Sequence, residues 1–270
     1  MKKYHSFIVY LAIITLFSCG GKKESPQATI EATVEEGLKT TLFEFNDTTR
    51  LVPHMSASPT LAINITLPVI DAGKQSITDN INQAIAYTLF ESNDNSLVAA
   101  CGTFADARKK EYAEMLPEYI NLRETSSGPL HWFNNYYLIT GEAKKGYKGI
   151  INYTIYFEEF TGGAHPNSSY TVLNFNPENG EEILLDAIFT PGYETELEKK
   201  ITESILAQYN ASNATELKEK GIEGIYISNN FILDKEEITF IYNKYDIAPY
   251  SEGDIFVSLS YDSLKEILKQ

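Results

Sequence analysis

Histidine and cysteine are scarce in this 270-residue chain, which has 4 histidines and 2 cysteines. Beyond the first 18 residues only His54, His131 and His165 remain, without the paired spacing of zinc ligands. The chain also contains no G-x-S-x-G motif, no phosphate-binding glycine loop, no dinucleotide fingerprint and no H-E-x-x-H pair. We therefore expect no metal, no cofactor and no catalytic residue, although an enzyme with an unrecognised carboxylate or histidine site stays open as an alternative.

Positive charge is also in short supply. The chain has 22 lysines and arginines against 37 acidic residues, a formal charge of −15. Phosphate groups are bound mainly by Lys and Arg, so a nucleic-acid partner is not expected. Charge of this sign keeps a protein soluble, and it also attracts cationic partners.

A long apolar run is absent, and the single short one lies at the N-terminus. Lys2 and Lys3 precede the apolar residues 7–17, which are too few to span a bilayer, since a spanning helix needs about 20. A charged start, a short apolar core and small residues after it are typical of a secretory signal peptide, here residues 1–18. We expect the mature chain to lie outside the cytoplasm, in the cell envelope.

The end of this segment, Leu16-Phe17-Ser18-Cys19, resembles the lipobox of bacterial lipoproteins. The resemblance implies cleavage before Cys19, fatty acylation of Cys19 and attachment to a membrane, which two or more acyl chains make stable. An ordinary signal peptide that happens to contain a cysteine is the alternative. Loss of Lys2 and Lys3 would change the formal charge from −15 to −17. Cys101 would then be the only thiol, and its apolar surroundings predict a buried, unreactive side chain.

The remaining chain is interpreted as a flexible tether, residues 19–45, followed by two halves, residues 46–160 and 161–270. In the first half, residues 60–69 alternate as a half-buried strand, and a helix follows with Ser76 as its expected N-cap. A second helix is expected from about Thr103, ending or kinking at Pro117. Residues 131–143 and 146–160 then predict two hairpin strands.

The second half is expected to open with another hairpin around the turn at residues 177–180. A long helix follows, in which Tyr193, Leu197, Ile201 and Ile205 recur at fours, and then short strands to the C-terminus. Because hairpins predominate and helices do not alternate regularly with strands, we predict an α+β fold of antiparallel sheets with helices packed on them, in two associated halves.

The segment TGGAHPNSSYTVLNF, residues 161–175, is the most distinctive local stretch. Gly162 and Gly163 permit positive φ, and Pro166 forces His165 into an extended conformation, so these residues predict a shaped corner between two strands. His165 is expected to help hold this corner, which is also a suitable place for a binding loop. Glu158 and Glu159 point to opposite faces of a strand, so they are not a catalytic pair, and a solvated strand end is expected there.

Residues 161–167 (TGGAHPN), 172–175 (VLNF), Gly180 and 184–189 (LLDAIF) resemble one half of the PdaC/RsiV-like extracytoplasmic domains. Residues 245–253 (YDIAPYSEG) and 261–264 (YDSL) resemble the C-terminal signature of the same family. Some relatives are the outer parts of anti-sigma factors that sense lysozyme by binding it, and others accompany polysaccharide deacetylases that act on peptidoglycan. Many are lipoproteins of unknown role.

The resemblance implies a non-enzymatic domain that binds an envelope partner, either a lysozyme-like cationic hydrolase or cell-wall glycan. The loops around residues 162–166 and 247–253 would carry the contact. The candidate partner-binding residues are Gly162, Gly163, His165, Pro166, Pro249 and Tyr250. The alternatives are an envelope hydrolase or deacetylase-related enzyme, or a structural or assembly lipoprotein.

Overall fold

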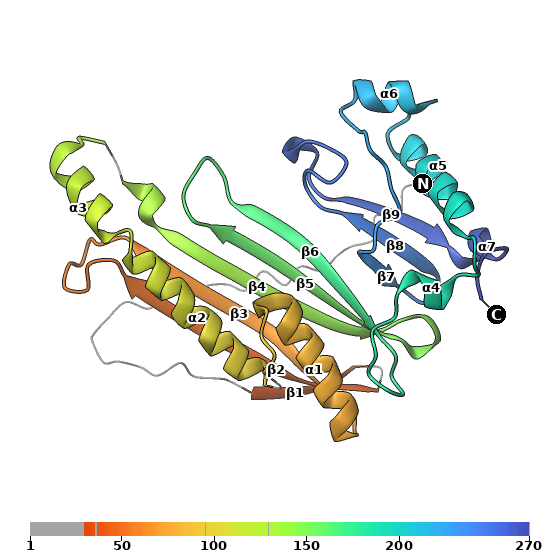
Figure 1. Cartoon of the computed structure of the whole chain (residues 1–270), viewed down its shortest axis with the longest axis horizontal. Coiled ribbons are helices and arrows are strands. Elements are labelled where there is room, and N and C mark those ends of the chain that lie inside the picture. Colours follow the sequence, from red (N-terminus) through yellow and green to blue (C-terminus); the bar gives the residue numbers. More distant parts are fainter. Residues whose placement is uncertain (1–29, 36, 95, 129, 270) are drawn as a thin grey trace.

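The computed structural model describes residues 30–269, except 36, 95 and 129. The predicted signal peptide and Cys19 lie outside these residues. The described chain is an α+β fold with a six-stranded and a three-stranded sheet, and helices pack on both, so the predicted fold class is confirmed (Figure 1). None of the helices in the described part of the chain has the length and apolarity that a membrane span requires.

The larger sheet has the strand order β1-β2-β3-β4-β5-β6. All neighbouring pairs are antiparallel except β3 and β4, which are parallel. A parallel pair needs a long crossover, and three helices between β3 and β4 supply it. The strands are β1 Ile30–Glu35, β2 Leu38–Arg50, β3 Thr60–Asp71, β4 Asn135–Lys145, β5 Ile151–Phe160 and β6 Asn167–Phe175.

The crossover helices cover one face of the larger sheet (Figure 1). They are α1 (Gln75–Phe90), α2 (Leu97–Ala113) and α3 (Leu116–Thr125). The four-residue spacing in α1 buries its apolar face against alternate residues of β3, which form one continuous core with it. The break predicted at Pro117 is confirmed, because α2 ends before it and Pro117 lies in the first turn of α3, where proline is favoured.

The smaller sheet has the order β7-β8-β9 and is antiparallel. The predicted long helix is α5, Glu194–Gln208, and its buried residues Leu197, Ile201 and Ile205 pack against this sheet in a second apolar core. The strands are β7 Phe231–Leu233, β8 Glu237–Tyr242 and β9 Ile255–Ser260. The shorter helices are α4 Leu185–Ile188, α6 Ala214–Glu219 and α7 Tyr261–Leu264, and the 3₁₀ turns are His131–Phe133, Tyr147–Gly149 and Tyr250–Glu252.

Asparagine side chains join the two sheets. Asn152 of β5 exchanges two hydrogen bonds with the backbone of Leu233, both 2.9 Å, in the manner of a neighbouring strand. From the side of the smaller sheet, Asn230 and Asn243 donate to the carbonyl of Tyr170 in β6, at 2.9 and 3.0 Å. They also accept from the backbone N–H groups of β6, at Val172 and Tyr170 respectively. We call Asn152, Asn230 and Asn243 the asparagine brackets.

The structure departs from the sequence-based boundaries in several places. Residues 30–45, within the predicted tether, belong to β1 and β2, which run to Arg50. The boundary predicted between residues 160 and 161 falls in the turn between β5 and β6, and both strands belong to the larger sheet. The hairpin expected around residues 177–180 is reduced to a single bridge, Phe175 to Glu182. The N-cap of α1 is Lys74, so the expectation for Ser76 is wrong, and α2 begins at Leu97 rather than near Thr103.

Candidate functional site

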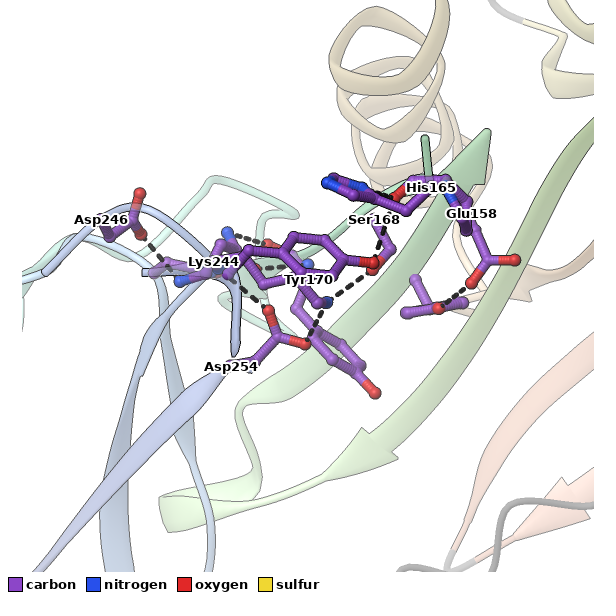
Figure 2. Close-up of polar contacts among 12 residues, drawn as sticks. Glu158, His165, Ser168, Tyr170, Lys244, Asp246 and Asp254 are labelled. Atoms are coloured by element: carbon purple, nitrogen blue, oxygen red, sulfur yellow. Dashed lines mark hydrogen bonds and ion pairs between the residues drawn. The ribbon is translucent and has the colours of Figure 1, made fainter. Parts of the chain in front are cut away.

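Most of the residues singled out from the sequence meet at one corner, formed by the β5–β6 turn and the loop of residues 243–254 (Figure 2). Gly162 and Gly163 have φ of 101° and 108°, which glycine adopts without steric cost. His165 lies beyond them, exposed, with its Nδ1 3.1 Å from the carbonyl oxygen of Pro166. His165 therefore contacts the backbone of the turn in which it lies.

Tyr250 connects the second loop to this turn. Its ring stacks on His165 with centroids 3.9 Å apart, and its hydroxyl donates to the carbonyl of Pro166 at 3.2 Å. Pro249 precedes it in extended conformation and caps the 3₁₀ turn that carries Tyr250. Two loops separated by about 80 residues are therefore held in register by one ring contact and one shared carbonyl.

A lysine at the centre of the corner ties β6 to the second loop (Figure 2). The Nζ of Lys244 donates to Ser168 Oγ at 2.6 Å and to Asp254 Oδ2 at 3.0 Å. The side chains of Lys244 and Asp254 are 15% and 12% exposed, so this pair is largely removed from solvent. Asp254 also accepts from the backbone N–H of Lys244 at 3.1 Å. This arrangement makes Lys244 a clamp that orders the loop.

Glu158 of β5 lies directly opposite Ser168 of β6, so the two side chains point to the same face of the larger sheet. Its two carboxylate oxygens accept from the hydroxyls of Tyr136 at 2.7 Å and Tyr156 at 2.5 Å. Burial, with Glu158 as the next cause, raises the pKa of Tyr136 to about 12 and also raises that of Tyr156. Glu158 is therefore held by two neighbouring tyrosines and partly buried, so the solvated strand end expected here is wrong for this residue.

Tyr245 is the most exposed large apolar side chain of the corner, at 63%. Its φ is 72°, a left-handed conformation that non-glycine residues rarely adopt. The surrounding loop holds it there, since Tyr245 N donates to Ala248 O and Asp246 N donates to Asn243 O, both at 3.0 Å. Strained residues that a scaffold maintains cluster at functional sites. The side chain contacts Tyr250 at 5.8 Å between centroids, which extends the aromatic surface begun by His165.

The corner combines exposed aromatic rings with a largely buried lysine–aspartate pair. Ser168 Oγ and Asp254 Oδ2 both lie within hydrogen-bond distance of the Nζ of Lys244, at 2.6 and 3.0 Å. Within the described residues, no group of three or more His, Cys, Asp or Glu side chains could hold a metal. Cys101 is fully buried in α2, and burial raises its thiol pKa to about 12, in agreement with the predicted unreactive thiol.

The structure thus brings together His165, Pro166, Pro249 and Tyr250 with the two glycines that shape the turn. Sequence reasoning did not select Tyr245, Lys244, Asp254 or Ser168. Tyr245 stands in the C-terminal motif next to residues that were selected, and its exposure is a property of the folded loop. The contact between Lys244 and Ser168 spans 76 residues and has no local signature.

The second loop of the corner lies in a segment of the chain that matches a protein-family model. Residues 186–262 match the DUF3298 family model. That family is described as a protein of unknown function. The matched segment includes α5, the smaller sheet and the loop that carries Lys244, Tyr245, Tyr250 and Asp254. No curated protein matches the chain.

Two solved structures share the fold. A member of the DUF3298 family from Bacteroides fragilis NCTC 9343 is 26% identical, with a TM-score of 0.76, over 91% of this chain and 96% of its own. A DUF3298 family protein from Pseudomonas aeruginosa PAO1 is 16% identical, with a TM-score of 0.60, over 84% of this chain and 94% of its own. The second likeness is one of fold alone. Both likenesses cover far more of the chain than the segment 186–262 that matches the family model.

Proposed function

We propose that this protein is a membrane-anchored, extracytoplasmic lipoprotein whose domain binds a cationic protein of the cell envelope through the corner, without catalysing a reaction. The observation that carries the proposal is the ordered aromatic surface made by His165, Tyr245 and Tyr250. Rigid aromatic side chains that are ordered before binding lose little conformational entropy, and tyrosine is enriched among residues that dominate binding energy.

Charge supports a cationic partner. The chain carries −15 formally, and Asp246 and Glu252 are exposed beside the aromatic surface. Lys244, the lysine of the same loop, is paired with Asp254, so it does not offset these charges. An acidic surface of this kind steers a basic protein toward it and speeds association. The resemblance of the sequence to lysozyme-sensing domains makes a lysozyme-like hydrolase the first partner to test.

The anchor part of the proposal rests on the N-terminal sequence. A lipid on Cys19 would hold the domain at a membrane surface, where its partner would also be concentrated. Replacement of Cys19 by serine should release the protein from membranes when cells are fractionated. Recovery of the serine variant with the membranes, in the same amount as the unaltered protein, would refute anchoring through Cys19.

The binding test is calorimetric titration of residues 20–270, which contain every described strand and helix, with a c-type lysozyme. We expect saturable binding with fixed stoichiometry at physiological salt, and tighter binding at low salt because exposed charges are screened within about 8–10 Å. Tyr245→Ala should weaken binding about tenfold or more, as removal of a dominant contact does. Tyr87→Ala is the matched control, because Tyr87 is 59% exposed on α1 and lies away from the corner.

Absence of heat at both salt concentrations would exclude a lysozyme-like partner. Equal losses in the Tyr245 and Tyr87 variants would move the contact away from the corner. Binding that is independent of salt would remove the electrostatic part of the proposal and leave the aromatic part.

A further inference from the structure

A cavity lies beside Thr161, at the start of the β5–β6 turn, and its other lining residues are not part of the corner. It has a volume of about 140 Å³ and opens between α2, the start of β4 and Thr161. Its walls include the apolar side chains of Leu61 and Met115 and the ring of Tyr112. Arg108 and Asn135 supply polar groups to the same walls.

Two buried polar atoms on residues that line this cavity have no hydrogen-bond partner among the described residues. One is Nε of Arg108, an N–H donor, and the other is Oδ1 of Asn135, an acceptor. Asn135 is only 7% exposed, and its amide nitrogen contacts the sulfur of Met115, a weak acceptor, at 3.5 Å. Exchanging the amide oxygen and nitrogen would place the oxygen beside the sulfur and the nitrogen where no partner lies, so one polar atom stays unsatisfied in either assignment. Buried polar groups without partners are uncommon in native proteins and need an explanation.

The charge of the cavity is balanced. Nη2 of Arg108 is 2.6 Å from Oε1 of Glu111, and the guanidinium lies over the ring of Phe104 at 5.4 Å. The positive charge of Arg108 is therefore shared with a carboxylate, which disfavours an anionic occupant. The hydroxyl of Tyr112 already donates to the carbonyl of Phe133 at 2.8 Å. Tyr137 also lines the cavity, and its hydroxyl interacts with the guanidinium of Arg108. The buried atoms of the lining residues that stay without a partner are one donor, Nε of Arg108, and one acceptor, Oδ1 of Asn135.

We propose that this cavity binds the acetamido group of an N-acetylated amino sugar. The acetamido C=O would accept from Nε of Arg108, its N–H would donate to Oδ1 of Asn135, and its methyl group would pack against Leu61 and Met115. This pattern of one acceptor, one donor and one methyl group complements the two unsatisfied atoms and the apolar wall. The proposal does not depend on the protein partner of the corner.

The size of the cavity favours a terminal group. Pockets that enclose a whole small ligand measure about 300–1,000 Å³, so 140 Å³ accommodates one substituent while the rest of the ligand stays outside. An acetamido group projects from a sugar ring and can enter such a hollow. A peptide amide within a chain is flanked by residues on both sides and cannot enter in the same way. A single water could bridge the two polar atoms, but the volume exceeds the ~30 Å³ share of one water several-fold.

The test is titration of residues 20–270 with the trimer of N-acetylglucosamine, followed by saturation-transfer NMR of the acetyl methyl signals. The glucosamine trimer, which lacks the acetyl groups, and N-acetyl-alanine methylamide, which carries the group on a peptide, are the comparison probes. We expect saturable binding of the acetylated sugar alone. Arg108→Lys, which keeps the charge beside Glu111 and removes the Nε donor, should weaken binding about fivefold, and so should Asn135→Ala.

Arg123→Lys is the matched control, since Arg123 is exposed on α3. Thermal unfolding of each variant checks that the fold is retained. A variant that does not fold is replaced by Met115→Gln, which reduces the apolar area of the cavity wall. Absence of saturable binding, or equal binding of the acetylated and deacetylated sugars, would overturn the proposal. So would preference for the peptide probe, or affinities unchanged in the Arg108 and Asn135 variants. Lysozyme titration of the same variants should be unaffected, which separates this proposal from that of the corner.

Discussion

Gly146 gives a sharp test of how the two sheets are joined. It lies buried between β4 and β5, against Leu233 of β7. A Cβ atom at this position would be 1.8 Å from the carbonyl oxygen of Leu233 and 2.2 Å from Nδ2 of Asn152. Its φ of −112° is negative, so the left-handed region is not the reason for glycine here, and the contact with the neighbouring backbone is a cost of Gly146→Ala.

The magnitude follows from the bonds that must break. Observed Cβ contacts are essentially never under 3.0 Å, so β7 must withdraw by about an ångström or more. That movement breaks both hydrogen bonds between Asn152 and Leu233, which are 2.9 Å long. If each of these two buried hydrogen bonds costs about 1–3 kcal/mol when it is broken without replacement, Gly146→Ala should lower the free energy of unfolding by about 2–6 kcal/mol.

The assay is urea unfolding of residues 20–270, followed by far-UV circular dichroism and by the fluorescence of Trp132, the single tryptophan. Gly102→Ala is the matched control. Gly102 lies inside α2 with open space around it, so alanine should stabilise by about 0.5–1 kcal/mol. A Gly146→Ala protein within about 0.5 kcal/mol of the unaltered one would show that β7 does not press on this turn, and the described joint between the sheets would be refuted.

Two further predictions concern charge and pH. Asp254→Asn leaves the ammonium of Lys244 without its ion pair and should cost about 2–3 kcal/mol in urea unfolding, less than for a fully buried pair because the side chains keep some exposure. The double variant with Lys244→Met should recover part of that loss, and an equal or greater loss would contradict the pairing. Burial raises the pKa of the Cys101 thiol from 9.0 to about 12, and it raises the pKa of Tyr136 to about 12. Both groups therefore hold their protons more tightly in the folded chain than in the unfolded one. The free energy of unfolding should therefore be retained below about pH 9 and fall as the pH rises toward 12. The fall should be shallower in Cys101→Ala. If the free energy of unfolding falls equally steeply with pH in both proteins, the thiol is excluded as a contributor.

The sequence predicted those helices and strands for which the local spacing of apolar residues is a sufficient signal. The helices α1 and α5 follow from apolar residues at four-residue spacing, and β3 from alternation, because each element buries one face against a core. The stretch before residue 45 was misjudged for the opposite reason. Strands β1 and β2 are stabilised by pairing with each other and with β3, a contact between distant segments that local composition does not reveal.

The candidate site likewise contains parts that the local sequence predicts and parts that depend on contacts between distant segments. Gly162, Gly163 and Pro166 shape the turn locally, so the corner itself was predictable from one short stretch. The stack of His165 on Tyr250 joins residues that are 85 positions apart, and only the resemblance of both stretches to one family drew attention to both. Glu158 was misjudged because its partners Tyr136 and Tyr156 give no signal in the sequence around it.

The asparagine brackets also bear on how this protein behaves when many copies are crowded together. Strand β6 is the last strand of the larger sheet, and such a strand offers N–H and C=O groups that another chain can pair with. Here the amides of Asn230 and Asn243 occupy those groups at Tyr170 and Val172. A side-chain amide satisfies one strand but presents no further strand to the next molecule. The ladder therefore stops at β6, so the joint between the sheets also protects against polymerisation through that edge.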